Sequence, residues 1–253
     1  MRFLNETWLV FVRAMRLSLR NKVWLIIGLM QPLLYLALFG PLLKRIAGLP
    51  GFPRGNSWQV FTPGLLVQLG IFGALFVGFG LISEVRDGVI ERMRVTPASR
   101  LALLAGRVLR DAVVLVVQSC VLLAAAYAFG MRAPIGGVVL AVLLVAAVGA
   151  AFASASYAVA LLTGTEDAMA SITNSLAVPL LLLSGILLPM TLAPGWLRTV
   201  SNFNPVKHIV DALRALFYGH IASGTVGIGL IVGVALIVVG MTFGTRTFQR
   251  DSG

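Results

Sequence analysis

Residues 135–163 read IGGVVLAVLLVAAVGAAFASASYAVALLT, a run without a single charged side chain. An α-helix needs about 20 consecutive apolar residues to cross the hydrocarbon core of a bilayer. This run is longer, so a helix formed by it can span the core and tilt. A helix that is apolar on every side must be covered by lipid or by other protein elements. The run therefore predicts a membrane-spanning helix.

Five further apolar segments lie on either side of it: Val23–Leu43, Val60–Ser83, Ala112–Met131, Ala168–Leu192 and Thr225–Phe243. The chain of 253 residues is 58% hydrophobic and 11% charged, whereas a soluble domain is about 25% charged. One soluble core cannot hide that surplus of apolar surface, so lipid must cover part of it. We therefore predict an all-α, polytopic membrane protein with six transmembrane helices in a single domain, 1–253.

The net charge of +11 would suggest nucleic-acid binding in a soluble protein. Here the basic residues flank apolar segments and no recognition motif accompanies them, so we expect no nucleic-acid partner. Six spans place both termini on one side, and 13 of the 20 Lys and Arg residues then share that side. The positive-inside rule assigns it to the cytoplasm of a bacterial inner membrane. Three basic residues in the first outer loop, Lys44, Arg45 and Arg54, go against this orientation.

The segment 1–22 predicts an amphipathic helix that lies in the membrane interface. On a helical wheel one side holds Leu4, Trp8, Phe11, Met15 and Leu19, and the other holds Arg2, Glu6, Arg13, Arg16 and Arg20. Such a helix buries its apolar face among lipids and places its basic face against anionic headgroups. We expect Trp8, Arg13, Arg16 and Arg20 to contact the interface. The alternative is a topology anchor with no further role.

The segment 84–111, EVRDGVIERMRVTPASRLALLAGRVLRD, is the most charged part of the chain. It holds four acidic residues and six arginines between the second and third spans, and Gly88 and Pro97 interrupt it. A solvated cytoplasmic loop would need only the basic residues to satisfy the positive-inside rule. Mixed charge is better suited to a protein partner. The spacing also predicts an i,i+4 ion pair between Arg107 and Asp111.

Motifs for energy coupling and for chemistry are missing from the sequence. A P-loop requires a Lys followed by Ser or Thr, but Lys22, Lys44 and Lys207 are followed by Val, Arg and His. We therefore expect the chain to bind no cofactor and to have no enzyme activity. The residues include no cluster typical of a metal site, and a single cysteine, Cys120, cannot form a disulfide within the chain. All nine acidic residues lie near span ends or in loops, which disfavours ion coupling.

Three amides fall in the middle of predicted spans: Gln31, Gln68 and Asn174. Because an amide is unfavourable in lipid, each should face protein or a water-filled cavity. They are therefore candidates for a weakly polar translocation path, and interhelical hydrogen bonding is the alternative. Small residues recur every fourth position in the fourth and sixth spans, among them Ser154, Gly240 and Gly244. That spacing predicts close helix packing within the subunit.

Two stretches resemble the same known family. The segment 88–111 is similar to the cytosolic connection of ABC-2-type transporter permeases, and 204–219, NPVKHIVDALRALFYG, is similar to the region before their last span. Within this family the daunorubicin-resistance-like membrane subunits are most similar. The resemblance implies a half-transporter that pairs with a second permease subunit, alike or homologous. Each subunit would dock a separate cytosolic ABC ATPase, two copies per complex, which holds ATP and Mg²⁺.

The resemblance also implies roles for particular segments. The segment 84–99 would be the cytosolic coupling loop, with a coupling helix around Gly88–Arg94. Its residues that would contact the ATPase are Glu84, Arg86, Asp87, Glu91, Arg92 and Arg94, while Thr96 and Pro97 would set the turn. The segment 193–224 would form short external helices over the exit path. The implied function is export of a hydrophobic or amphipathic drug, lipid or lipid-linked glycan; the alternative is an ion-coupled secondary multidrug carrier.

Overall fold

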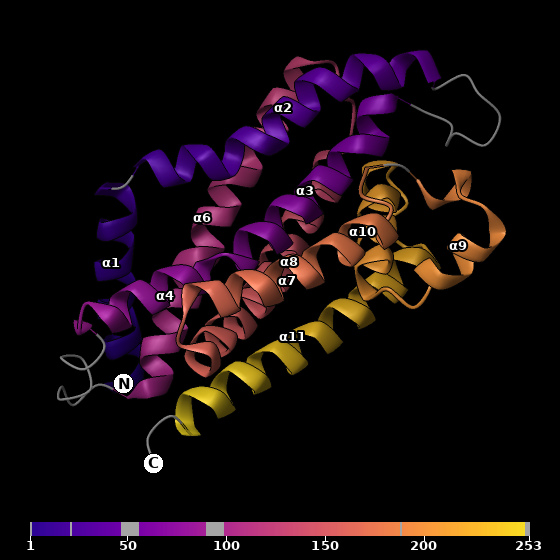
Figure 1. Cartoon of the computed structure of the whole chain (residues 1–253). Coiled ribbons are helices and arrows are strands. Elements are labelled where there is room, and N and C mark those ends of the chain that lie inside the picture. The colour runs from indigo at the N-terminus through magenta and orange to yellow at the C-terminus, as the bar shows by residue number, and fades with distance from the viewer. Residues whose placement is uncertain (1, 21, 47–55, 90–98, 188, 251–253) are drawn as a thin grey trace.

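The computed structural model describes residues 2–20, 22–46, 56–89, 99–187 and 189–250, and within these ranges the chain is helical and contains no strand (Figure 1). The helices are α1 Arg2–Arg20, α2 Lys22–Ile46, α3 Ser57–Leu75, α4 Val77–Arg86, α6 Arg100–Ala128, α7 Ile135–Thr163, α8 Glu166–Leu183, the 3₁₀ helix η1 Met190–Leu192, α9 Gly195–Ser201, α10 Pro205–Phe217 and α11 Gly224–Arg250. The all-α prediction is therefore confirmed for these residues.

Four helical stretches in the described residues are long and apolar enough to cross a membrane: Ser57–Arg86, Arg100–Ala128, Ile135–Thr163 and Gly224–Gln249. The first consists of α3 and α4, which meet at Phe76. These stretches match four of the six predicted spans. The predicted first span lies in α2, of which Ile26–Leu42 is a shorter apolar stretch. That the first and fifth segments cross the membrane thus stays a prediction.

The predicted fifth span, Ala168–Leu192, is wrong in its last third. Helix α8 ends at Leu183, and the backbone then turns at Gly185, whose φ is 72°. The hydroxyl of Ser184 accepts a hydrogen bond from the Ile186 N–H, which satisfies a donor that a continued helix would have used. Ile186 is buried beyond the turn. Apolar sequence continues through this region, so hydropathy alone could not locate the end of the helix.

The core is built around α7, which packs against α3, α4, α6 and α11. Small residues allow the closest approaches. A Cβ added at Gly240 would lie 2.5 Å from the Ala151 carbonyl oxygen, and one at Gly244 would lie 2.0 Å from the Ser154 hydroxyl. The small residues of the fourth and sixth spans therefore pack against each other within one subunit, as predicted.

The two ends of the bundle differ in what they hold. The start of α1, the end of α4, the start of α6 and the end of α11 lie at one end, and α9 lies at the opposite end (Figure 1). Helix α1 runs across the bundle at the first end rather than along it (Figure 1). The start of α1 and the end of α11 thus lie at the same end of the bundle as the end of α4 and the start of α6, the arrangement that an even number of crossings would produce (Figure 1).

Candidate functional site

The start of the segment 84–99 is held by an ion pair that crosses from α4 to α6. Arg107 Nη2 lies 2.5 Å from Glu84 Oε2, and the Arg107 side chain is only 6% exposed. An isolated buried guanidinium is unfavourable, so the Glu84 carboxylate is needed to compensate the charge of Arg107. The pair joins the last turns of one span to the first turns of the next.

A second ion pair lies close by and is more exposed. Arg86 Nη2 is 2.8 Å from Glu166 Oε1, at the start of α8. The exposed Asp87 caps α4 with its backbone N–H, and Gly88 follows with a φ of 67°, a conformation that favours glycine. The helix therefore ends in a sharp turn just where the charged segment begins.

The far end of the segment is held by α1. The side chain of Ser99 caps α6 by accepting a hydrogen bond from the Ala102 N–H, and the Ser99 N–H donates to Glu6 Oε2 at 2.8 Å. Further along, a Cβ added at Gly106 would lie 2.7 Å from Val10, so the two helices touch closely. Helix α1 is thus fastened to the first turns of α6.

Three faces can be distinguished on α1. One contacts α6; a second exposes the apolar side chains of Leu4, Trp8 and Leu19. The third exposes Arg13, Arg16 and Arg20. The helix and its amphipathic character agree with the sequence, and the lipid contacts of Trp8 and the three arginines stay a prediction.

A polar cluster lies deeper between α1, α6 and α7. The Tyr157 hydroxyl donates to Asp111 Oδ2 at 2.5 Å, and Arg110 Nε is 3.2 Å from Asp111 Oδ1. Arg110 also donates to the Ser18 hydroxyl at 3.0 Å. The predicted pair between Arg107 and Asp111 is therefore wrong, because contacts between helices outweigh an i,i+4 preference of about 0.2–0.5 kcal/mol.

The same cluster borders a cavity of about 100 Å³ between α2, α3, α6 and α7. Gly28 and Gln118 line it together with Arg110 and Asp111. The expectation that acidic residues stay near span ends holds for Asp111 only in part, since its helix begins eleven residues earlier, at Arg100. The sequence alone does not show this cavity, because it depends on how four helices meet.

The three amides predicted for a path do not line one cavity within the subunit. Gln68 is 1% exposed and neither of its amide atoms has a hydrogen-bond partner. Gln31 and Asn174 are exposed on α2 and α8. Polar side chains on the outer face of a membrane subunit are unfavourable against lipid, so further protein or water should lie beside them. Any path through Gln31 and Asn174 would therefore run along the outside of this subunit.

At the opposite end of the bundle, Arg214 of α10 connects three elements. Its Nε donates to the Val60 carbonyl at 3.0 Å and its Nη2 to the Gly185 carbonyl at 2.6 Å. Burial lowers the pKa of the Arg214 guanidinium to about 10, and Asp211 opposes that decrease. This clamp ties α10 to the start of α3 and to the turn after α8. Its signal in the sequence is an arginine on the otherwise apolar face of an amphipathic helix.

The remaining residues of the predicted coupling loop, Glu91, Arg92, Arg94, Thr96 and Pro97, lie outside the described residues. The part that the structure does describe fastens both sides of the loop to α1, α6 and α8. Within that part, no group of three or more His, Cys, Asp and Glu residues could hold a metal ion.

Residues 5–218 match the protein family described as ABC-2 type transporter. The chain belongs to the ABC-2 type transporter family. The match covers α1 to α10, so it includes the fastened loop and the Arg214 clamp of this ABC-2 chain. The chain is also similar to three individual proteins.

A daunorubicin resistance ABC transporter permease protein of Streptomyces coeruleorubidus is 28% identical to the ABC-2 chain over 242 residues, 95% of this chain and 84% of the relative. A "putative transport permease" of Cyanophora paradoxa is 27% identical over 217 residues, 85% of this chain and 75% of the relative. A "probable doxorubicin resistance ABC transporter permease protein" of Mycobacterium tuberculosis is 25% identical over 239 residues, 94% and 85%.

Proposed function

We propose that this chain is the membrane-spanning subunit of an ABC exporter that moves a hydrophobic or amphipathic substrate out of the cytoplasm. A separate ATPase subunit binds ATP and Mg²⁺ and supplies the work. Membership of the ABC-2 family supports the transporter class. The names of two relatives, which refer to daunorubicin and doxorubicin resistance, support a drug as substrate; lipids and lipid-linked glycans have the same amphipathic chemistry.

One observation carries the coupling part of this proposal: the segment 84–99 is fastened at both sides. Glu84 is bound by Arg107 of α6, Arg86 by Glu166 of α8, and Ser99 by Glu6 of α1. A force that a docked ATPase applies at either end of the segment is therefore passed through these contacts to α1, α6 and α8. The exposed Asp87, and Glu91, Arg92 and Arg94 beyond it, supply the charges for docking.

The exposed side of α8 supports a second subunit and a path between the two. Thr173 and Ala177 are buried, whereas Ser171, Asn174 and Ser175 are exposed on the other side of the helix. Such polar groups are unfavourable against lipid. A second permease subunit, identical or homologous, covers this side, and Asn174 lines the path with Gln31 of α2. The complex lies in the bacterial inner membrane with both termini in the cytoplasm.

The experiment measures transport in proteoliposomes that contain the chain, its second subunit and its ATPase. Arg86→Glu and Glu166→Arg are each expected to lower the substrate moved per ATP hydrolysed. The double variant R86E/E166R restores the pair and the coupling. This pair is suited to exchange because both side chains are substantially exposed and tolerate reversal. Lowered coupling that the double variant fails to restore contradicts the role of this pair.

Docking itself is tested with a second double variant, E91K/R94E. Transport is expected to be abolished while insertion into the membrane stays normal, because reversing both charges removes complementarity to the ATPase. Co-purification of the ATPase in mild detergent measures docking directly. Unchanged transport and unchanged co-purification would remove the coupling role of the segment.

The ion-coupled carrier remains a second candidate because Asp111 lies inside the helix bundle beside a cavity. Buried carboxylates of this kind serve proton relays in carriers. Arg110 and Tyr157 already bind this carboxylate, which is an arrangement typical of a structural ion pair. Transport that collapses with a protonophore and continues without ATP would favour the carrier over the exporter.

A further inference from the structure

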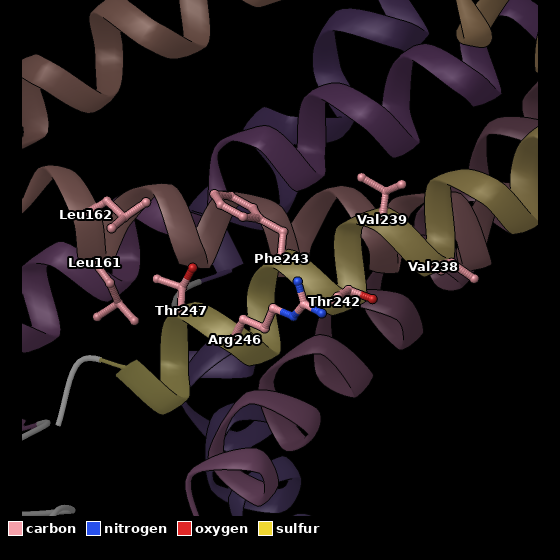
Figure 2. A pocket seen from close by; sticks show the side chains of 8 residues that line it. All are labelled: Leu161, Leu162, Val238, Val239, Thr242, Phe243, Arg246 and Thr247. Atoms are coloured by element: carbon pink, nitrogen blue, oxygen red, sulfur yellow. The ribbon is translucent and has the colours of Figure 1, made fainter. Parts of the chain in front are cut away.

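A groove of about 810 Å³ lies between the C-terminal parts of α7 and α11 (Figure 2). Leu161 and Leu162 of α7 form one wall, and Val238, Val239 and Phe243 of α11 form the other. Ligand sites in proteins commonly measure about 300–1,000 Å³ and are mostly apolar. The groove therefore has the size and lining of a site for an apolar molecule.

The groove exists because the two helices touch closely along a neighbouring face. Gly240 and Gly244 of α11 lie against the backbone of α7 at Ala151 and Ser154. The larger side chains next to these glycines do not fit between the two helices. They therefore lie on the exposed side of the contact, where they line the groove. Val239 is 66% exposed and Leu162 is 68% exposed, so a hydrophobic neighbour is needed to cover them.

One positive charge lies at the end of the groove nearest the C-terminus. Arg246 lines the groove, is exposed, and forms no ion pair within the described residues. Its side chain extends along α11 toward Thr242, which also lines the groove (Figure 2). Arg246 lies three residues beyond the end of the predicted sixth span. This position places its side chain at the depth of the phospholipid headgroups. From Val238 to Arg246 the helix rises about 12 Å, enough for a substantial part of an acyl chain.

The charges of α7 and α11 argue against a second copy of the chain as the occupant. Neither helix contains an Asp or Glu residue. A two-fold contact through this face would bring α7 and α11 of two copies together, and neither helix offers Arg246 an acidic partner. An anionic molecule supplies the missing negative charge.

We propose that the groove is a binding site for an anionic phospholipid. Its phosphate pairs with Arg246, with the hydroxyls of Thr242 and Thr247 close by, and an acyl chain lies along Leu162, Val239 and Phe243. Anionic lipids are abundant in the cytoplasmic leaflet, where a basic residue adds about 1 kcal/mol to membrane affinity. The site would make the packing of α7 and α11 respond to the lipid composition of that leaflet.

The test uses the full chain in bilayers of phosphatidylcholine with a tryptophan placed in the groove by Phe243→Trp. Brominated phosphatidylglycerol and brominated phosphatidylcholine are compared as quenchers of the additional fluorescence. Phosphatidylglycerol is expected to bind about fivefold more tightly at this position, the ratio that one basic contact gives. Arg246→Gln in the same background should remove the preference, and Arg246→Lys should keep most of it.

Arg13→Gln is the matched control, because Arg13 is an exposed arginine of α1 outside the groove, and it should leave the preference unchanged. Equal quenching by the two lipids, or a preference that survives Arg246→Gln, would overturn the proposal. Absence of quenching by either lipid would overturn it too, and would show that protein covers the groove.

Discussion

The carboxylate of Glu84 and the guanidinium of Arg107 are 23 residues apart in sequence and 2.5 Å apart in space. The pair bridges the ends of two neighbouring spans, and the segment between them is the most charged part of the chain. Arg107 is buried here while Glu84 is partly exposed. The cation is therefore the partner that depends more strongly on the contact.

Glu84→Gln is expected to destabilise the protein by about 1–3 kcal/mol, because the buried guanidinium loses its charged acceptor. The midpoint of thermal unfolding in detergent, followed by circular dichroism, measures the change. Glu166→Gln is the matched control: it breaks the more exposed pair with Arg86, for which a loss below about 1 kcal/mol is expected. Equal losses for the two variants would show that burial does not distinguish these pairs.

The sequence could predict those elements that are defined by a pattern within their own segment. Uninterrupted apolar runs predicted α7 and α11. The helical period of α1 predicted its separate apolar and basic faces. The partner of Arg107 could not be predicted, because an i,i+4 spacing suggests Asp111 and gives no information on α4. The end of α8 was missed for a related reason: the turn at Gly185 is held by Arg214, 29 residues away.

Gly64→Ala is expected to destabilise the protein by about 1–3 kcal/mol through overpacking. The added Cβ would lie 2.2 Å from the carbonyl oxygen of Ile186, and backbone cannot move aside as a side chain can. Gly73→Ala in the same helix is the control, since no heavy atom lies within 4 Å of its added Cβ. That variant should be neutral or stabilise the helix by up to about 1 kcal/mol. Thermal unfolding of both variants in the same detergent tests the difference.

Arg214→Lys is expected to lower stability almost as much as Arg214→Gln, because one ammonium group cannot reach both carbonyls that the guanidinium binds. The expected loss is about 3–6 kcal/mol, because each hydrogen bond made by a charged group contributes about 1.5–3 kcal/mol. Full recovery by lysine would mean that charge alone matters at this position.

The effect of pH on the Arg214 clamp follows from its pKa, which burial lowers to about 10. Below that value Arg214 is protonated in both the folded and the unfolded chain, so its contribution to stability is constant with pH. Above about pH 10 the folded protein binds fewer protons than the unfolded chain, and wild-type stability should rise relative to Arg214→Gln. Unfolding midpoints from about pH 6 to pH 9 should therefore show a constant difference between the two proteins.

The exposed side of α8 is expected to contact the second permease subunit. Val178 lies one turn beyond Asn174 on this side and is itself exposed, so p-benzoylphenylalanine replaces it without removing a buried contact. Irradiation of membranes that contain the whole complex should then give a covalent product of two permease subunits. Val234 of α11 is equally exposed, on a helix that we expect to face lipid, and the same replacement there should give no such product. A photoreactive ketone captures either an identical or a homologous partner, so the result does not depend on which of the two is present. Products from both positions, or from Val234 alone, would contradict the placement of the second subunit on α8.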